Sequence, residues 1–203
     1  MNYLSNNFFG IAAGAMSVLA FVPYVWAILK GETRPSGASW WTWTLLVFIT
    51  ITSSWAAGAP WQVLILPAWL CFSQFGVALL SLKYGDNNWD VINIACIGLA
   101  LVGIALWVIT GQPLIALGLS IIADFFASVP NFRHIWKNPK QENRTGWTLG
   151  WLSAVLEVAA ITQWSLAESG WAVYFLFSMT TNFLLVWRTP VKLNRGRIKQ
   201  FAH

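Results

Sequence analysis

Two carboxylates, Asp124 and Glu157, lie within long apolar stretches of the sequence. An ionised carboxylate at the middle of a bilayer costs on the order of 3 kcal/mol by insertion scales. Such a group must face a wet cavity, pair with a cation or carry a proton. No Lys or Arg lies at a comparable depth in either stretch, so a salt bridge is not expected. The acids therefore indicate proton-coupling groups on a transport path, or alternatively protonated acids that donate to neighbouring carbonyl groups.

Helical spacing groups these acids with other side chains. Residues four or seven apart share one face of a helix. Glu157 and Trp164 are seven apart and are expected on a common face. Two polar pairs are four apart: Asp124 with Ser128, and Ser178 with Asn182. These faces are the candidates for lining a cavity.

Composition places these residues in a membrane protein. The chain of 203 residues is 57% hydrophobic and only 9% charged, whereas soluble domains carry about 25% charged residues. Apolar runs of spanning length predict an all-α integral membrane protein with seven transmembrane helices and a lipid bilayer as its main partner. These runs lie at about 8–29, 39–57, 61–82, 90–109, 113–136, 146–165 and 170–187.

The basic residues test this count. With seven spans, all twelve Lys and Arg fall on one side of the membrane, which is the positive-inside pattern. The pattern predicts an outside N-terminus and a cytoplasmic basic tail at 191–203, in a plasma (inner) membrane. It also accounts for the formal net charge of +5 without nucleic-acid binding.

Two segments of the chain resemble each other at a constant offset. Val22-Pro23 and Val129-Pro130 each precede an Ile and a Lys at matching positions. We therefore expect a 3+1+3 parallel repeat of three-helix bundles, a known transporter architecture. Its parts are a first repeat at 1–84, a linker helix at 85–110 and a second repeat at 111–190. Pro23 and Pro130 are predicted to act as paired hinges, although proline is also frequent in membrane helices generally.

With this layout, the chain resembles the PQ-loop and SWEET superfamily of seven-helix transporters. The proline pairs that carry the resemblance are Pro23-Tyr24 and Pro130-Asn131, which keep the prolines but not the glutamines. The resemblance implies sugar uniport. It also implies a substrate pocket formed by Trp55 with Gln74 and by Trp164 with Asn182; Gln74 departs from the usual Asn.

The same sequence features are also compatible with other functions. The PQ-loop branch includes proton-coupled amino-acid exporters, so a proton-coupled carrier of an amino acid or other small metabolite is the main alternative, followed by a non-transporting receptor. The sequence contains no HExxH, no GxSxG, no Gly-rich phosphate loop and no cluster of metal-binding residues. We therefore expect no enzyme, no cofactor and no metal. A homo-oligomer is possible.

Overall fold

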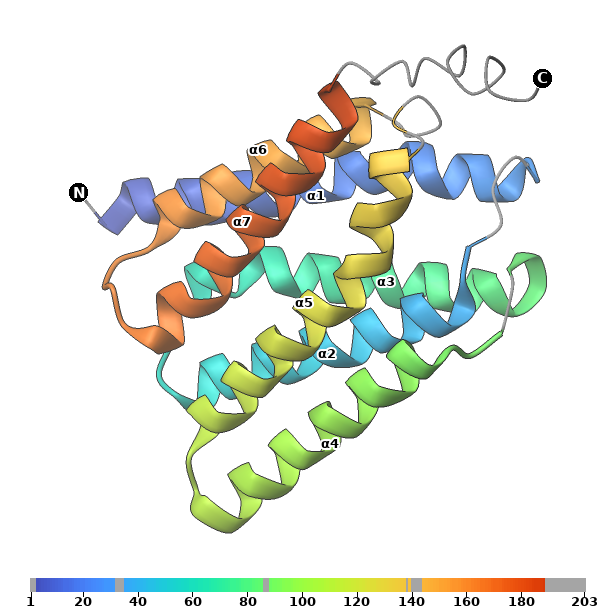
Figure 1. Ribbon diagram of the computed structural model, residues 1–203. Coiled ribbons are helices and arrows are strands. Elements are labelled where there is room, and N and C mark those ends of the chain that lie inside the picture. The colour runs from blue at the N-terminus through green and yellow to red at the C-terminus, as the bar shows by residue number, and fades with distance from the viewer. Residues whose placement is uncertain (1–2, 32–34, 86–87, 138, 140–143, 189–203) are drawn as a thin grey trace, which may run out of the picture.

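The computed structural model describes residues 3–31, 35–85, 88–137, 139 and 144–188, and in this part of the chain it is all-helical. The predicted tail at 191–203 lies outside the described residues. Within these residues, seven α-helices and one 3-10 helix follow one another (Figure 1). They are α1 (Tyr3–Leu29), α2 (Gly37–Ala56), η1 (Trp61–Val63), α3 (Ile65–Tyr84), α4 (Val91–Thr110), α5 (Pro113–Lys137), α6 (Arg144–Ala160) and α7 (Leu166–Trp187).

Local signals in the sequence define several helix ends. Ser36, Asp90 and Ser165 cap the N-termini of α2, α4 and α7, where each side chain accepts a hydrogen bond from a backbone N–H in the first turn. Gly111 ends α4 in the left-handed conformation, with φ of 66°, which favours glycine. These short polar and glycine positions separate long apolar helices.

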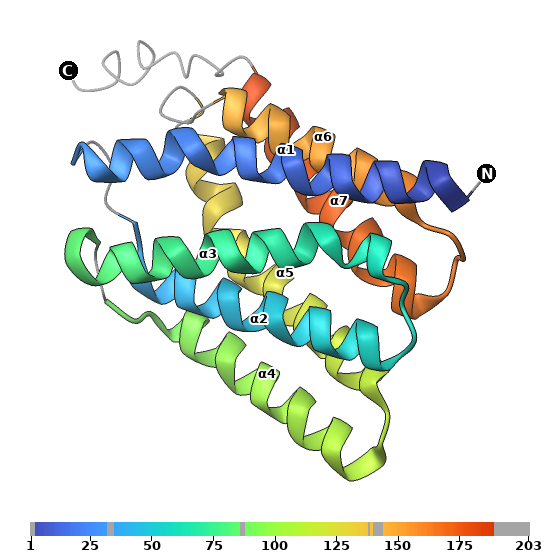
Figure 2. The ribbon, with the colours of Figure 1, turned by 180° about the vertical axis from the view of Figure 1, so that it is seen from behind.

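The helices have the same neighbours in the two halves of the chain. α3 packs against both α1 and α2, and α7 packs against both α5 and α6. Between the halves, α1 contacts α6 and α2 contacts α5, while α4 covers α5 and part of α2 (Figures 1 and 2). α5 therefore touches α2, α4 and α7.

Much of the outer surface is apolar. Within the described residues, four helical segments are long and apolar enough to cross a membrane: Asn6–Leu29, Trp61–Tyr84, Val91–Thr110 and Leu166–Trp187. α4 buries a narrow face of small residues that includes Ala100 and Gly103, and exposes aliphatic side chains such as Val108, which is 78% exposed. An aliphatic helix face that no other helix covers fits contact with lipid.

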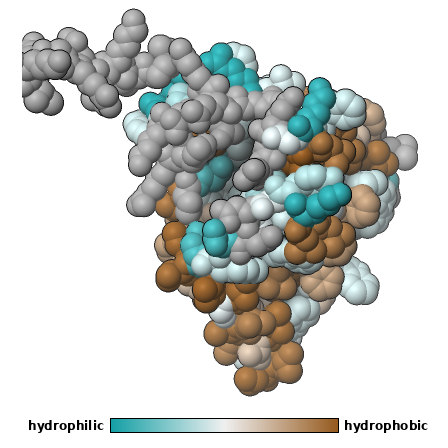
Figure 3. All heavy atoms as spheres, turned by 90° about the vertical axis from the view of Figure 1, so that its right-hand side faces the viewer, coloured by the Kyte–Doolittle hydropathy of each residue, from teal (hydrophilic) through white to brown (hydrophobic). Residues whose placement is uncertain are grey.

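Hydrophilic side chains gather at one end of the bundle. Figure 3 looks onto the end where α1 and α3 finish, and hydrophilic residues lie in its upper part while hydrophobic surface covers the lower part. Among the described basic residues, Lys30 follows α1, Lys83 ends α3 and Arg188 follows α7. This separation of polar end and apolar flank is typical of a membrane protein.

Two glycines on one face of α1 bring it close to η1 and to the first turns of α3. Gly10 lies against the backbone carbonyl of Gln62, and Gly14 lies against the side chains of Ile65 and Trp69. The spacing of four residues places both glycines on the same side of the helix. Small residues at this spacing allow backbones to approach closely in membrane helices.

We expect Gly10→Ala and Gly14→Ala to lower the thermal stability of the detergent-solubilised protein. The added Cβ would collide with Gln62 O at Gly10 and would lie 2.7 Å from the Trp69 ring at Gly14. Overpacking of this kind costs about 1–3 kcal/mol. Gly118→Ala is the control, because a Cβ there meets no atom within 4 Å. Equal stability of all three variants would contradict the close approach of α1.

Candidate functional site

A polar stripe runs along one face of α5. Its members are Ser120, Asp124, Ser128 and Asn131, spaced four, four and three residues apart. This spacing keeps all four side chains on one side of the helix. Ser120 and Ser128 are buried, and Asp124 and Asn131 are partly buried. The stripe is therefore an interior feature of the bundle.

α7 presents a matching polar face to the C-terminal part of this stripe, from Asp124 to Asn131. The Tyr174 hydroxyl donates to Asp124 Oδ2, and Asn131 Nδ2 donates to Asn182 Oδ1 at 3.0 Å. Asn182 in turn donates from Nδ2 to the carbonyl of Ser178 at 3.0 Å. We call the set Asp124, Ser128, Asn131, Tyr174, Ser178 and Asn182 the α5–α7 seam. It joins the two polar faces expected from the sequence at Asp124/Ser128 and Ser178/Asn182.

Ser120, at the N-terminal end of the stripe, contacts α2 instead. Ser120 Oγ lies 3.1 Å from Thr50 Oγ1, and both side chains are buried. Other hydroxyls of α2, including those of Thr42, Thr44 and Ser53, donate to carbonyl groups of their own helix. Thr50 is thus the α2 hydroxyl that links the two halves of the chain through a hydrogen bond in the described residues.

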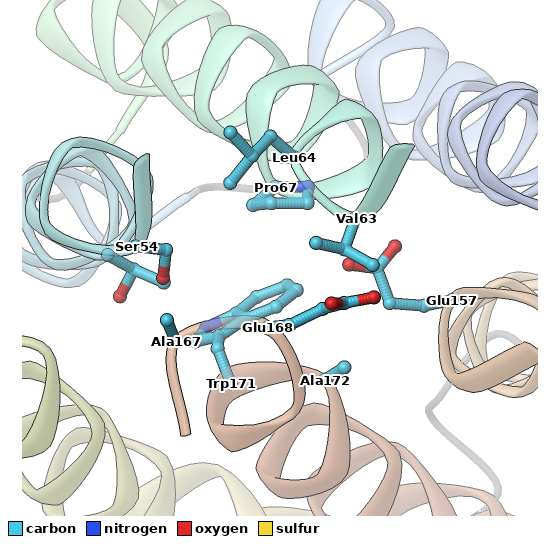
Figure 4. A pocket seen from close by; sticks show the side chains of 10 residues that line it. Ser54, Val63, Leu64, Pro67, Glu157, Ala167, Glu168, Trp171 and Ala172 are labelled. Atoms are coloured by element: carbon cyan, nitrogen blue, oxygen red, sulfur yellow. The ribbon is translucent and has the colours of Figure 1, made fainter. Parts of the chain in front are cut away.

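A small cavity lies where α2, η1, α3, α6 and α7 meet (Figure 4). Its water-accessible volume is about 10 Å³, which is near the lower limit for one water molecule. A sugar does not fit in this conformation. The lining residues are Thr50, Ser54, Val63, Leu64, Pro67, Glu157, Ala167, Glu168, Trp171 and Ala172. Half of them belong to the first half of the chain and half to the second.

The two acids at this cavity differ in their hydrogen bonding. Glu168 accepts from the backbone N–H groups of Thr162 and Gln163 and from the Thr162 hydroxyl, which holds the α6–α7 connection in place. Glu157 is 0% exposed, and neither of its carboxylate oxygens has a hydrogen-bond partner in the described structure. Burial of an unpaired polar group is costly, so Glu157 is the less satisfied of the two.

The two tryptophans expected at a binding site, Trp55 and Trp164, lie outside the cavity. Trp55 is the penultimate residue of α2 and is 71% exposed, and Trp164 is 73% exposed. The expectation that Glu157 and Trp164 share a helical face is wrong, because α6 ends at Ala160 and Trp164 lies in the connection that Glu168 folds back. Neither indole lines the cavity. Their role in substrate binding stays a prediction.

The remaining predicted residues have separate environments. Gln74 in α3 is partly buried, and its Oε1 is enclosed without a hydrogen-bond partner in the described structure. Asn182 is 2% exposed and belongs to the α5–α7 seam. Pro23 lies inside α1, which continues through it to Leu29. Pro130 falls within α5, but its side chain lies outside the described residues.

Three residues with a clear place in these sites were missed from the sequence. Tyr174 extends the α7 face by one turn beyond Ser178. Thr50 is one of several hydroxyls on α2, and the signal that distinguishes it is the repeat offset, at which it corresponds to Glu157. Glu168 stands three residues after Ser165, which is the spacing of a helix capping box. This spacing indicates that a new helix begins after Ser165, so the preceding helix must end before Trp164.

The chain matches no protein-family model, no curated protein and no solved structure. The resemblance to the PQ-loop and SWEET superfamily therefore rests on the helix layout and the two prolines.

We expect Tyr174→Phe to destabilise the protein by about 1–2 kcal/mol, because it removes the hydroxyl that donates to Asp124 within an apolar bundle. Chemical or thermal unfolding in detergent measures the change. Tyr84→Phe is the control, since the Tyr84 ring contacts Lys83 and its hydroxyl makes no hydrogen bond in the described part of the chain. A Tyr174 variant as stable as the control would show that the seam bond contributes nothing.

Proposed function

We propose that this protein is a seven-span membrane carrier for a small polar solute, which works by alternating access between residues 1–84 and 111–190. The observation that carries the proposal is the α5–α7 seam, in which Asp124 and two amide side chains meet inside an apolar bundle. Ionisable residues at such positions are rare in membrane helices and typically mark ion or substrate pathways.

The arrangement of the helices supports two moving units. The neighbours α1–α3–α2 in one half match α5–α7–α6 in the other, and the cross-contacts α1–α6 and α2–α5 match in the same way. Two parallel three-helix units related by a two-fold axis would produce this set of contacts. The cavity between the halves lies where their separation would admit solvent.

The orientation follows from the charges. If the seven helices cross the membrane in alternating directions, four basic residues at helix ends fall on the same side of it. They are Lys30, Lys83, Arg144 and Arg188. By the positive-inside rule this side is cytoplasmic, so the N-terminus lies outside, in a plasma (inner) membrane.

Two substrate classes compete. A sugar-like solute is implied by the family resemblance, which assigns the binding surface to Trp55 and Trp164. A proton-coupled carrier of an amino acid or similar metabolite is favoured by Asp124, which is held by Tyr174 at an interior position. Because both indoles are largely exposed, the acids now carry more weight than the tryptophans, and we favour the coupled carrier.

Labelling of single cysteines tests the topology. We expect Gln112→Cys and Gln163→Cys, both exposed in connections, to react with an impermeant thiol reagent from outside intact cells, and Lys30→Cys to react only after permeabilisation. Wild type is the control, because Cys71 is partly buried and Cys96 is buried. External labelling of Lys30→Cys would contradict the seven-span path.

Uptake into proteoliposomes tests transport. We expect the wild type to accumulate one class among labelled sugars, amino acids and nucleosides, and to respond to a pH gradient. Asp124→Asn should lose gradient-driven accumulation while it keeps exchange of bound solute, since it retains the shape but loses the proton site. Asp90→Asn is the control, because Asp90 is an exposed N-cap of α4 and Asn also caps helices well.

Equal uptake by Asp124→Asn and Asp90→Asn along a pH gradient would favour a uniporter of the sugar type. Absence of uptake for every solute, with binding retained, would favour a receptor.

A further inference from the structure

The cavity at Glu157 contains an electrostatic imbalance that the carrier proposal leaves unexplained. Two carboxylates, Glu157 and Glu168, line it together, and none of its lining residues is Lys, Arg or His. Figure 4 shows the Glu157 side chain reaching in from α6 and the Glu168 side chain from α7. Both are buried, at 0% and 4% exposure.

Their hydrogen bonds show which acid lacks a partner. Glu168 already accepts from two backbone N–H groups and one hydroxyl, so its negative charge is compensated by fixed donors. Both oxygens of Glu157 are enclosed and unpartnered among the described residues. A group of positive charge must therefore come from outside the described chain, or Glu157 must be neutral.

The helix that carries Glu157 adds to the negative potential. Glu157 lies three residues before Ala160, the last residue of α6. The C-terminal end of a helix carries the equivalent of about half a negative charge, which favours a cation within the last turn. On the facing side, Pro67 has no N–H, so the carbonyl of Val63 receives no α-helical hydrogen bond from it.

The hydrogen bonds of Ser120 show that Thr50 is the donor in the contact between these two hydroxyls. Ser120 Oγ donates its one proton to the carbonyl of Leu117 at 2.8 Å, so in its contact with Thr50 it must accept. Thr50 therefore donates to Ser120, and its own lone pairs stay available. Thr50 is also one of the residues that line the cavity.

We propose that this cavity is a binding site for a small, dehydrated monovalent cation of the sodium type, with the Glu157 carboxylate as its main ligand. One uncompensated carboxylate balances one positive charge, whereas Mg²⁺ and Ca²⁺ require six or more oxygens and usually more than one free carboxylate. The volume of about 10 Å³ admits an ion without its water shell. A carboxylate attracts a small cation more strongly than a large one, because the two charges approach more closely, and this favours Na⁺ and Li⁺ over K⁺.

A cation also explains the cavity better than a proton on Glu157 does. Protonation would neutralise the Glu157 carboxylate, but it would leave the negative potential of the α6 C-terminal end without a positive partner in the cavity. A bound cation would balance the carboxylate and this potential together. The site would supply a second coupling ion in addition to the proton site at Asp124, and in this respect it rests on the proposed function.

Equilibrium binding of radioactive sodium to the full-length protein in detergent tests the site without any transport step. We expect saturable binding at a stoichiometry near one, displaced by Li⁺ more strongly than by K⁺. Glu157→Gln should abolish it, and Glu157→Asp should keep it at reduced affinity. Thr50→Val should weaken it by about tenfold, equivalent to about 1.4 kcal/mol.

Thr52→Val is the matched control, because Thr52 lies on the same helix and its hydroxyl bonds to the carbonyls of Phe48 and Ile49. It should bind sodium like the wild type. Should Glu157→Gln fail to fold, the contrast between Thr50→Val and Thr52→Val decides the matter.

Three results would overturn the site: no saturable sodium binding by the wild type, equal binding by Glu157→Gln, or thermal stability that depends on pH through Glu157 but not on sodium. A protein that binds sodium but transports no solute would leave the site standing and refute the carrier.

Discussion

The organisation of this bundle depends on a single constraint: polar groups within an apolar interior must find their hydrogen-bond partners inside the bundle. α5 meets this constraint along its whole polar stripe, since Ser120 bonds to Thr50 on α2 while Asp124 and Asn131 bond to Tyr174 and Asn182 on α7. Lipid offers no hydrogen bonds, so each of these pairs disfavours a rotation of α5 about its axis. The stripe thereby fixes the orientation of α5, which contacts helices of both halves.

The two halves use their interiors differently. At the repeat offset, the position of Asp124 in α5 corresponds to Ser17 in α1, and the Ser17 hydroxyl donates to Gly14 within its own helix. α1 instead packs closely through Gly10 and Gly14. In the first half, α1 thus packs closely against η1 and α3, whereas the second half holds Asp124, Glu157 and Glu168.

The sequence predicted the all-helical class and seven helices close to their observed bounds, because apolar runs and charged breaks are local signals. It also identified the faces Asp124/Ser128 and Ser178/Asn182, because helical spacing is local as well. It did not show that these faces meet, since pairing between α5 and α7 depends on the packing of all seven helices.

The prediction that Trp164 lies in the same helix as Glu157 was wrong for a different reason. Hydropathy continues past Ala160, but the helix does not, because Glu168 binds the N–H groups that α6 would have needed for another turn. A side chain from the following helix therefore overrides the local pattern. The cavity beside Glu157 was equally hidden from the sequence, as its walls come from five elements.

The position of that cavity connects ion binding with movement of the halves. Thr50, Ser54 and Pro67 belong to the first half, and Glu157, Glu168 and Trp171 belong to the second. Separation of the halves at this end would open the cavity and hydrate Glu157, whereas closure removes water and leaves the carboxylate without a partner. A cation that binds the closed cavity more tightly than the open one shifts the equilibrium towards closure by its difference in affinity. Without the cation, the unpaired carboxylate favours the open form. The same residue would then make occupancy of the site and the conformation of the protein depend on each other, which is the property that a coupled carrier requires.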